Sequence, residues 1–155
     1  MKLKIAAVGR LRAGPEHDLV SGYLDRFNKT GRALGLGPVA LQEVEAKKGG
    51  MSAEAVLLQR AVAGCNPICV LDERGKTLTS PQFADLLAKW RDEARGEAAF
   101  VIGGADGIDA SLRNKAGFSL SFGKMVWPHM LVRVMLAEQL YRAASILAGS
   151  PYHRV

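Results

Sequence analysis

The end of the chain carries three consecutive side chains that suit binding to a nucleotide. Tyr152, His153 and Arg154 follow Pro151 directly. They offer an aromatic ring for stacking, an imidazole that titrates near neutral pH and a guanidinium that can hold a phosphate. A chain terminus is usually frayed and inert, so a tail that concentrates these groups, residues 150–155, is a candidate functional segment.

Two glycine-containing segments are candidates for binding a ligand. Residues 103–107 read GGADG and follow an apolar run, and residues 120–129 read LSFGKMVWPH. Glycine allows a backbone to run close to a ligand, and backbone donors between apolar walls suit a cofactor that carries a purine. A plain tight turn and a connecting loop are the alternative interpretations of the two segments.

Other chemistries lack their motifs. A phosphate-binding P-loop ending at Gly75–Thr77 would need glycine at position 70, where Val70 stands. The GGADG segment is not a GxGxxG dinucleotide motif. His17, His129 and His153 have no metal-ligand spacing with one another or with the cysteines, and no nucleophile elbow is present. We therefore expect no metal site.

The basic charge of the chain is concentrated at its two ends. The formal net charge is +6, and residues 1–12 contain four basic residues and no acid. From residue 111 onward there is one acid, Glu138, and six basic residues, namely Arg113, Lys115, Lys124, Arg133, Arg142 and Arg154. This distribution suits a polyanion, although a solvated surface without a partner would look the same.

The remaining composition predicts a soluble cytoplasmic protein that does not bind membranes. No run approaches the roughly 20 apolar residues of a membrane helix, and the apolar stretch after the first residues is too short for a signal peptide. Cys65 and Cys69 make no disulfide framework, so we interpret both as reduced thiols.

Alternating strands and helices are expected to position these segments. We expect strands at 4–9, 39–45, 66–72, 98–103 and 119–122, and helices at 16–27, 52–62, 80–94, 110–116 and 128–148. Ser52 and Ser80 are expected N-caps, Pro81 the first residue of its helix, and Gly149 the stop of the last helix. The order predicts one α/β domain, residues 1–155, with a mainly parallel sheet flanked by helices. Ligands bind beyond the carboxyl ends of such strands, which here are Gly9-Arg10, Leu71-Asp72 and 103–107.

Several motifs together resemble one enzyme family. They are FVIGGADG at 100–107, LSFGKMVWPHMLVRVMLAEQLYRA at 120–143, the terminal PYHRV, and LDERGK at 71–76 followed by SPQFADLL. With the N-terminal MKLKIAAVG and the chain length, they resemble the SPOUT-class 23S rRNA pseudouridine N3-methyltransferases. The resemblance spans essentially the whole chain and is least distinctive at about 28–50.

The resemblance implies a SPOUT fold with a C-terminal trefoil knot, a homodimer packed through the C-terminal helices, and S-adenosylmethionine as methyl donor. The substrate would be N3 of a pseudouridine in a stem-loop of 23S rRNA, on an assembled ribosomal particle. The cofactor site carried over from the family comprises Leu71, Gly103, Phe122, Gly123, Lys124, Met125, Val126 and Trp127. The apolar residues of helix 128–148 cover more than one stripe, which agrees with a helix that buries two faces.

Methyl transfer to N3 requires loss of an imide proton, and the side-chain types suggest which residues could assist this step. His153 is the best candidate base by type, and Tyr152 could stack on the target. Arg142 and Arg154 could hold phosphates or stabilise developing negative charge, and Glu138 lies four residues before Arg142, on the same helix face.

Three other functions remain open from the sequence. The chain could be another knotted methyltransferase, acting on tRNA or on a ribose hydroxyl. It could be a non-enzymatic RNA-binding factor of the same fold, or a flavodoxin-like binder of a small molecule.

Overall fold

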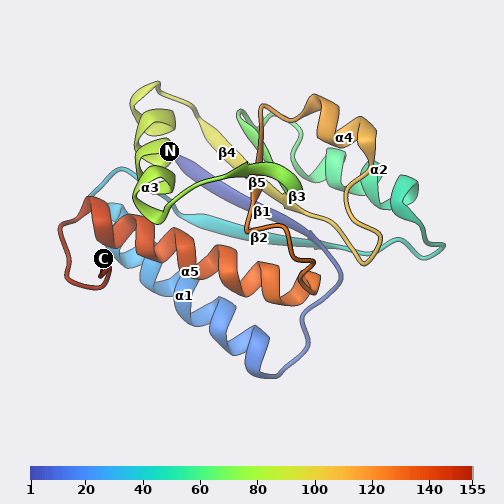
Figure 1. The fold of residues 1–155 in the computed structure, drawn as a ribbon, viewed down its shortest axis with the longest axis horizontal. Helices are drawn as coiled ribbons and strands as arrows, with labels where there is room; N and C mark the ends of the chain where they lie inside the picture. Colours follow the sequence, from blue (N-terminus) through green and yellow to red (C-terminus); the bar gives the residue numbers. More distant parts are fainter. Residues whose placement is uncertain (155) are drawn as a thin grey trace.

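The computed structural model describes residues 1–154 and contains one five-stranded sheet (Figure 1). Val155, the last residue of the predicted functional tail, lies outside the described residues. The strands are β1 (Lys2–Val8), β2 (Val39–Val44), β3 (Ile68–Thr77), β4 (Glu97–Ile102) and β5 (Phe118–Ser121). They lie in the order β2-β1-β4-β3-β5, and every neighbouring pair is parallel. The predicted parallel α/β architecture is confirmed.

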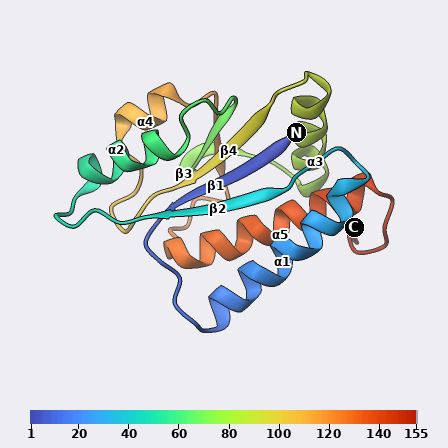
Figure 2. The ribbon, with the colours of Figure 1, turned by 180° about the vertical axis from the view of Figure 1, so that it is seen from behind.

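Helices cover both faces of this sheet (Figures 1 and 2). The helices are α1 (Pro15–Arg32), α2 (Met51–Ala61), α3 (Ser80–Asp92), α4 (Ala110–Lys115) and α5 (His129–Leu147). One core cluster joins α1, α3 and α5 to one face, and a second joins α2 and α4 to the other. Alternate residues of β1 serve the two clusters: Ile5 faces the first and Ala6 the second. No helix within residues 1–154 is both long and apolar enough to cross a membrane.

Two expected helix caps were wrong. Thr79, rather than Ser80, caps α3, because its hydroxyl accepts a hydrogen bond from the Gln82 amide while the Gln82 side chain accepts one from the Thr79 amide. Pro81 therefore stands at the second helical position. Gly50, rather than Ser52, occupies the N-cap of α2. Serine, threonine and glycine are all accepted at an N-cap, so the pattern alone could not choose between Thr79 and Ser80 or between Gly50 and Ser52.

The end of α5 agrees with expectation. Gly149 adopts a φ of 71°, and its amide donates to the carbonyl of Ile146. The Ser150 amide donates to the carbonyl of Ser145, which completes a Schellman motif. The motif reverses the chain direction, so the tail returns along the helix that it has just left.

Strand β3 is longer than predicted because it contains an interruption. Leu71 and Lys76 both pair with Leu120 of β5, so residues 72–75 leave the register between them. The bulge lies at the carboxyl edge of the sheet, beside the candidate ligand segments. Strand β5 stands at the edge of the sheet, whereas α5 begins next to β1, so residues 122–128 cross the carboxyl ends of the strands between them. The trefoil knot implied by the resemblance stays a prediction.

Candidate active site

A cavity of about 200 Å³ opens at the carboxyl ends of β3, β4 and β5. Of the eight predicted cofactor residues, the following line it: Leu71, Gly103, Phe122, Gly123, Met125, Val126 and Trp127. Lys124 is exposed and is absent from the wall. Three segments distant in sequence thus meet where the parallel-sheet rule placed them.

The turn after β4 explains why Gly103 is glycine. A Cβ on Gly103 would lie 2.5 Å from the carbonyl oxygen of Gly107, closer than any side chain is tolerated. The Gly107 amide donates to the Gly104 carbonyl at 3.0 Å, which closes the turn. The backbone of residues 103–107 therefore forms a tight wall of the cavity. A larger residue at 103 would displace that wall as well as block a ligand.

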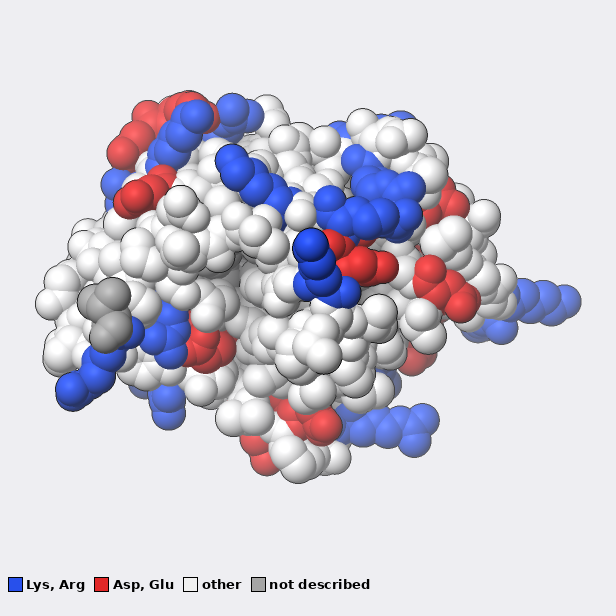
Figure 3. Space-filling view, viewed as in Figure 1, with Lys and Arg blue, Asp and Glu red and all other residues white. Residues whose placement is uncertain are grey.

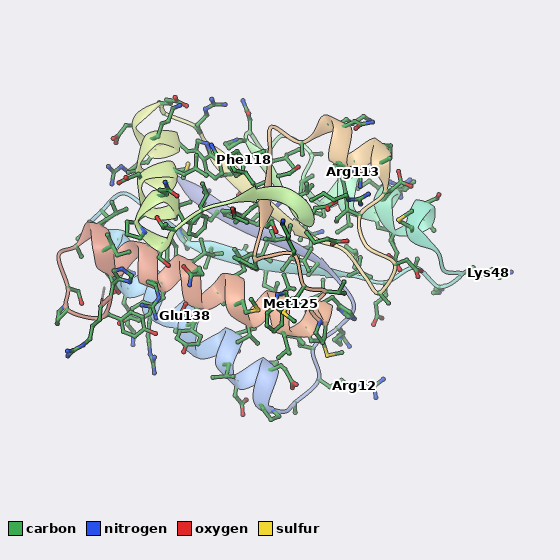
Figure 4. The ribbon with its side chains drawn as sticks, in the orientation of Figure 1. Arg12, Lys48, Arg113, Phe118, Met125 and Glu138 are labelled. Carbon is green, nitrogen blue, oxygen red and sulfur yellow. The ribbon has the colours of Figure 1, made fainter. Side chains whose placement is uncertain are left out.

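The opposite wall is apolar and open to solvent. Met125 and Val126 are 75% and 84% exposed, and Trp127 is 41% exposed. Figure 4 labels Met125 beside the first turns of α5. Large apolar side chains on a loop at this exposure are unusual unless a ligand or a second chain covers them.

A buried carboxylate holds the β3 bulge at the cavity rim. The Asp72 side chain is 3% exposed and accepts hydrogen bonds from the Arg74 amide at 2.9 Å, the Arg74 guanidinium at 3.0 Å and Arg113 at 3.3 Å. Burial alone would raise the pKa of Asp72, but these hydrogen bonds outweigh it and hold that pKa below its ordinary value. Sequence reasoning reached the position, as a strand end, without assigning the residue a role.

Arg133 is buried and therefore cannot contact a polyanion. Its inclusion among the basic residues that suit a polyanion was wrong. Its side chain is 0% exposed and donates to Glu43 at 2.8 Å and to the carbonyls of Val8 and Gly9 at 3.0 and 3.1 Å. Burial lowers the pKa of Arg133, and Glu43 opposes that shift. The guanidinium ties the start of α5 to the end of β1. A buried arginine cannot be told from an exposed one by its place in an amphipathic pattern.

His129 and Glu54 are two further polar residues that sequence reasoning missed. His129 lines the cavity, and its Nδ1 is buried without a hydrogen-bond partner. Glu54 approaches the Gly104 backbone, and its Oε2 is likewise buried and unpaired. Burial, helped by the neighbouring Arg133, lowers the pKa of His129 from its ordinary value. In the sequence, the place of His129 just after the loop at 120–128 is the one signal that could have indicated it.

Four of the predicted catalytic residues gather where the tail returns along α5, and Figure 4 labels one of them, Glu138, on this helix. Arg142 donates to Glu138 through Nε at 2.9 Å, which confirms the expected pairing on one helix face. The tail folds onto this pair: the Tyr152 hydroxyl donates to Glu138 at 3.0 Å, and Arg142 lies 3.1 Å from Nδ1 of His153. We call Glu138, Arg142, Tyr152 and His153 the tail cluster. Arg154 follows it and is exposed.

Aromatic packing fixes the tail cluster further. The Tyr152 ring lies 4.7 Å from that of Tyr141, and the Arg142 guanidinium stands 4.8 Å above the Tyr152 ring. Burial, together with the hydrogen bond to Glu138, raises the pKa of Tyr152 to about 12. The phenol therefore stays protonated at neutral pH and acts as a hydrogen-bond donor.

The hydrogen bond to Arg142 sets the tautomer of His153. A guanidinium has only donors, so Nδ1 of His153 must accept. The neutral ring then carries its proton on Nε2. In this arrangement His153 offers a donor to a substrate, and it can accept a proton only after the contact with Arg142 is broken.

The cavity and the tail cluster do not meet within one chain. No residue of the tail cluster lines the cavity. Glu138 instead borders a second hollow, between α1, α3 and α5, which shares Leu120, Phe122 and Gly123 with the cavity wall.

Figure 3 shows charged side chains over the upper part of the molecule and a largely uncharged band across its middle. Within residues 1–154, no group of three His, Cys, Asp or Glu side chains could hold a metal ion.

Comparison with known proteins identifies the family. A model described as predicted SPOUT methyltransferase matches residues 1–153. This chain belongs to the SPOUT methyltransferase family. The protein is 67% identical over its whole length to the ribosomal RNA large subunit methyltransferase H of Ruegeria pomeroyi, and 66% identical to that of Dinoroseobacter shibae. The chain covers all of both relatives.

Solved structures agree with the fold of this SPOUT methyltransferase. A probable methylase family protein from Haemophilus influenzae superposes with a TM-score of 0.56 at 13% identity. The match covers 99% of this chain and 70% of that one. At this identity the likeness establishes the shared fold alone.

Proposed function

We propose that this methyltransferase transfers a methyl group from S-adenosylmethionine to N3 of a pseudouridine in 23S ribosomal RNA. The observation that carries the proposal is the cavity, which unites the three segments by which the sequence resembles the pseudouridine N3 family. Full-length relatives at 65–67% identity bear the name of a large-subunit rRNA methyltransferase, which supports the same substrate.

The chemistry of the cavity lining fits S-adenosylmethionine. Its Gly-rich wall brings main-chain groups close to a ligand, and the segment 122–127 offers apolar surface for a purine. When bound, this cofactor supplies an electrophilic methyl group on a sulfonium. The protein's task is to place the target nitrogen in line, about 3–3.5 Å from that methyl carbon.

The tail cluster fits the substrate side of the reaction. Arg142 has guanidinium N–H groups beyond those bound to Glu138 and His153, and Nε2 of His153 adds a second donor. The single hydroxyl proton of Tyr152 already donates to Glu138. Donors aimed at a uracil-like ring stabilise the negative charge that develops when its imide proton leaves. Arg154, exposed beside them, would hold a phosphate.

We further propose that the working enzyme is a homodimer in which each tail cluster faces the cavity of the other chain. Exposed apolar side chains continue from the cavity wall over α1 and α5: Leu19, Met125, Val126, Trp127, Met130 and Leu131. A second copy of the chain would cover them and supply the donors that each cavity lacks. Leu136 and Leu140 of α5 are buried in the chain's own core and take no part in this surface.

One experiment tests the function. Labelled S-adenosylmethionine is incubated with the protein and, separately, free rRNA, large ribosomal subunits, whole ribosomes and tRNA, and the labelled nucleotide is mapped. We expect label at N3 of one pseudouridine of 23S rRNA, strongest on an assembled particle because a small chain must recognise a folded surface. Label in tRNA or on a ribose would contradict the proposal, and so would the absence of any label. Activity on ribosomes also implies a cytoplasmic site of action.

A further inference from the structure

Two residues with unpaired polar atoms approach the strand ends beside the cavity from opposite faces of the sheet. Strands β1 and β4 pair in parallel, with Ala7 opposite Ile102, so Gly9 and Gly104 follow on neighbouring strand ends. His129, from α5, places its ring carbon Cε1 3.6 Å from the Cβ position of Gly9. Glu54, from α2, places its carboxylate oxygens 2.9 and 3.1 Å from the Cβ position of Gly104.

Each of these half-buried residues has one polar atom that is buried without a hydrogen-bond partner, Nδ1 of His129 and Oε2 of Glu54. A buried polar atom without a partner destabilises the folded protein. The position is the point where the sheet order reverses, since α1 leads from β1 to one side and the later strands lie on the other. Ligands of parallel sheets bind at this point. An unsatisfied carboxylate and imidazole here indicate a role in the reaction.

We propose that His129, under the electrostatic influence of Glu54, accepts the imide proton from N3 of the target base during methyl transfer. This inference rests on the proposed function. The N3–H bond breaks and its proton moves to Nε2 of His129, while the N3 electron pair forms the bond to the methyl carbon. The electrons of the carbon–sulfur bond stay on sulfur, which leaves as a neutral thioether.

The surroundings of His129 suit an acceptor. A proton on the buried Nδ1 leaves the lone pair on Nε2 for the substrate. Glu54 forms no hydrogen bond with the ring and acts on it through its charge. The charged groups packed around the ring are Arg133 on its own helix and Glu54 on α2, with Glu43 of β2 paired to Arg133. Burial and Arg133 lower the pKa of His129, so the ring is neutral at pH 7 and ready to accept. Glu54 raises that pKa in part and is a positioning residue.

His153 acts as a hydrogen-bond donor, in contrast to His129. Its Nδ1 already accepts a hydrogen bond from Arg142, so its other nitrogen is a donor. His129 is the histidine with an unpaired nitrogen at the cavity itself. One histidine thus removes the proton, and the other stabilises the charge that remains.

The test measures single-turnover methyl transfer with labelled S-adenosylmethionine on large ribosomal subunits that lack the modification. His129→Ala should slow the chemical step by about 10²–10⁴-fold while calorimetry finds S-adenosylmethionine bound with near wild-type affinity. His17→Ala, at an exposed histidine of α1, should leave the rate unchanged. A wild-type rate in His129→Ala would overturn the proposal.

The pH profile separates catalysis from a structural effect. The wild-type rate should fall as pH drops through the lowered pKa of His129, because the protonated ring cannot accept. Glu54→Gln removes the charge that raises this pKa, so its acid limb should move to lower pH and its rate should fall, whereas Glu93→Gln should change neither. An acid limb that stays in place in Glu54→Gln would contradict the proposal.

Failure of this inference is distinguishable from failure of the proposed function. If the wild-type protein labels N3 of a pseudouridine and His129→Ala does so equally fast, only the role of His129 is wrong. If the wild-type protein labels another atom or no rRNA, the proposed function itself is wrong.

Discussion

The cavity and the tail cluster are built in opposite ways. The cavity is largely main chain: a turn closed by glycines and a loop crossing the strand ends, held at its rim by the buried Asp72. The tail cluster consists of side chains, joined by hydrogen bonds on the surface of one helix. The main-chain part of the cavity survives most single changes but cannot take up a proton, and His129 in the cavity wall is a side chain that can. The side chains of the tail cluster supply donors and charge, yet in one chain they lie away from the cavity.

The largest effect is expected from removing the tail. Deletion of residues 152–155 takes away the Tyr152 ring and the Nε2 donor of His153 while leaving every cavity residue in place. Methyl transfer should fall at least about 100-fold, and calorimetry should find S-adenosylmethionine affinity within about twofold of wild type. Equal losses of binding and of rate would show that the two regions are one site in each chain.

Disrupting the proposed dimer should be nearly as damaging. Leu131 is 41% exposed on α5, so Leu131→Glu should spare the fold and separate the chains, with loss of methyl transfer. Val56→Glu, at a similarly exposed apolar residue of α2 on the opposite face, is the matched control and should stay dimeric and active. Analytical ultracentrifugation measures whether each variant is a dimer, and a methyl-transfer assay measures its activity. A fully active Leu131→Glu monomer is the contrary result.

Arg154 should contribute a smaller, purely electrostatic effect. Arg154→Ala should weaken RNA binding and reduce the slope of log K against log salt by about 0.7–0.9, the value for one phosphate contact. The rate at saturating substrate should change little. Binding titrations over a range of salt concentrations test this, and an unchanged slope would remove Arg154 from the RNA contact.

The smallest effect concerns the cavity rim. The pKa of Asp72 is lowered in the folded protein, so its contribution to stability is present above its ordinary pKa and is lost as pH falls through the folded value. Asp72→Asn should reduce stability by about 1–3 kcal/mol near pH 7 and flatten the dependence of the melting temperature on acid pH. Thermal unfolding between pH 3 and pH 7 measures both, and an unchanged acid profile would contradict this role.

Much of the fold followed from the sequence because its strands are continuous apolar runs. The apolar runs of β1 and β4, which alternate with helical segments, were sufficient to predict the parallel sheet. The Gly149 stop was sufficient to predict the end of the last helix. The cavity residues came through resemblance, and the strand-end rule indicated the same place. The bulge after Leu71 escaped prediction, because an interruption in register leaves no mark in a hydrophobic pattern.

The two histidines show where sequence reasoning stopped. Residue type alone favoured His153 as a base, and only its contact with Arg142 fixes it as a donor. No pattern in the sequence indicated a role as a base for His129. That role depends on the burial of Nδ1 and on the charge of Glu54, which lies far away in the chain. Hydrogen-bond partners decide the chemistry of an imidazole, and they become known only with the fold.

Mixing two inactive variants tests most directly whether cavity and tail cluster act across the dimer. Gly103→Val, which displaces the cavity wall, is refolded together with the chain lacking residues 152–155, and mixed dimers are verified by mass spectrometry. If each tail serves the partner's cavity, half of the dimers hold one working site, so methyl transfer should return to about a quarter of the wild-type rate. Mixed dimers that form but stay inactive would contradict the account.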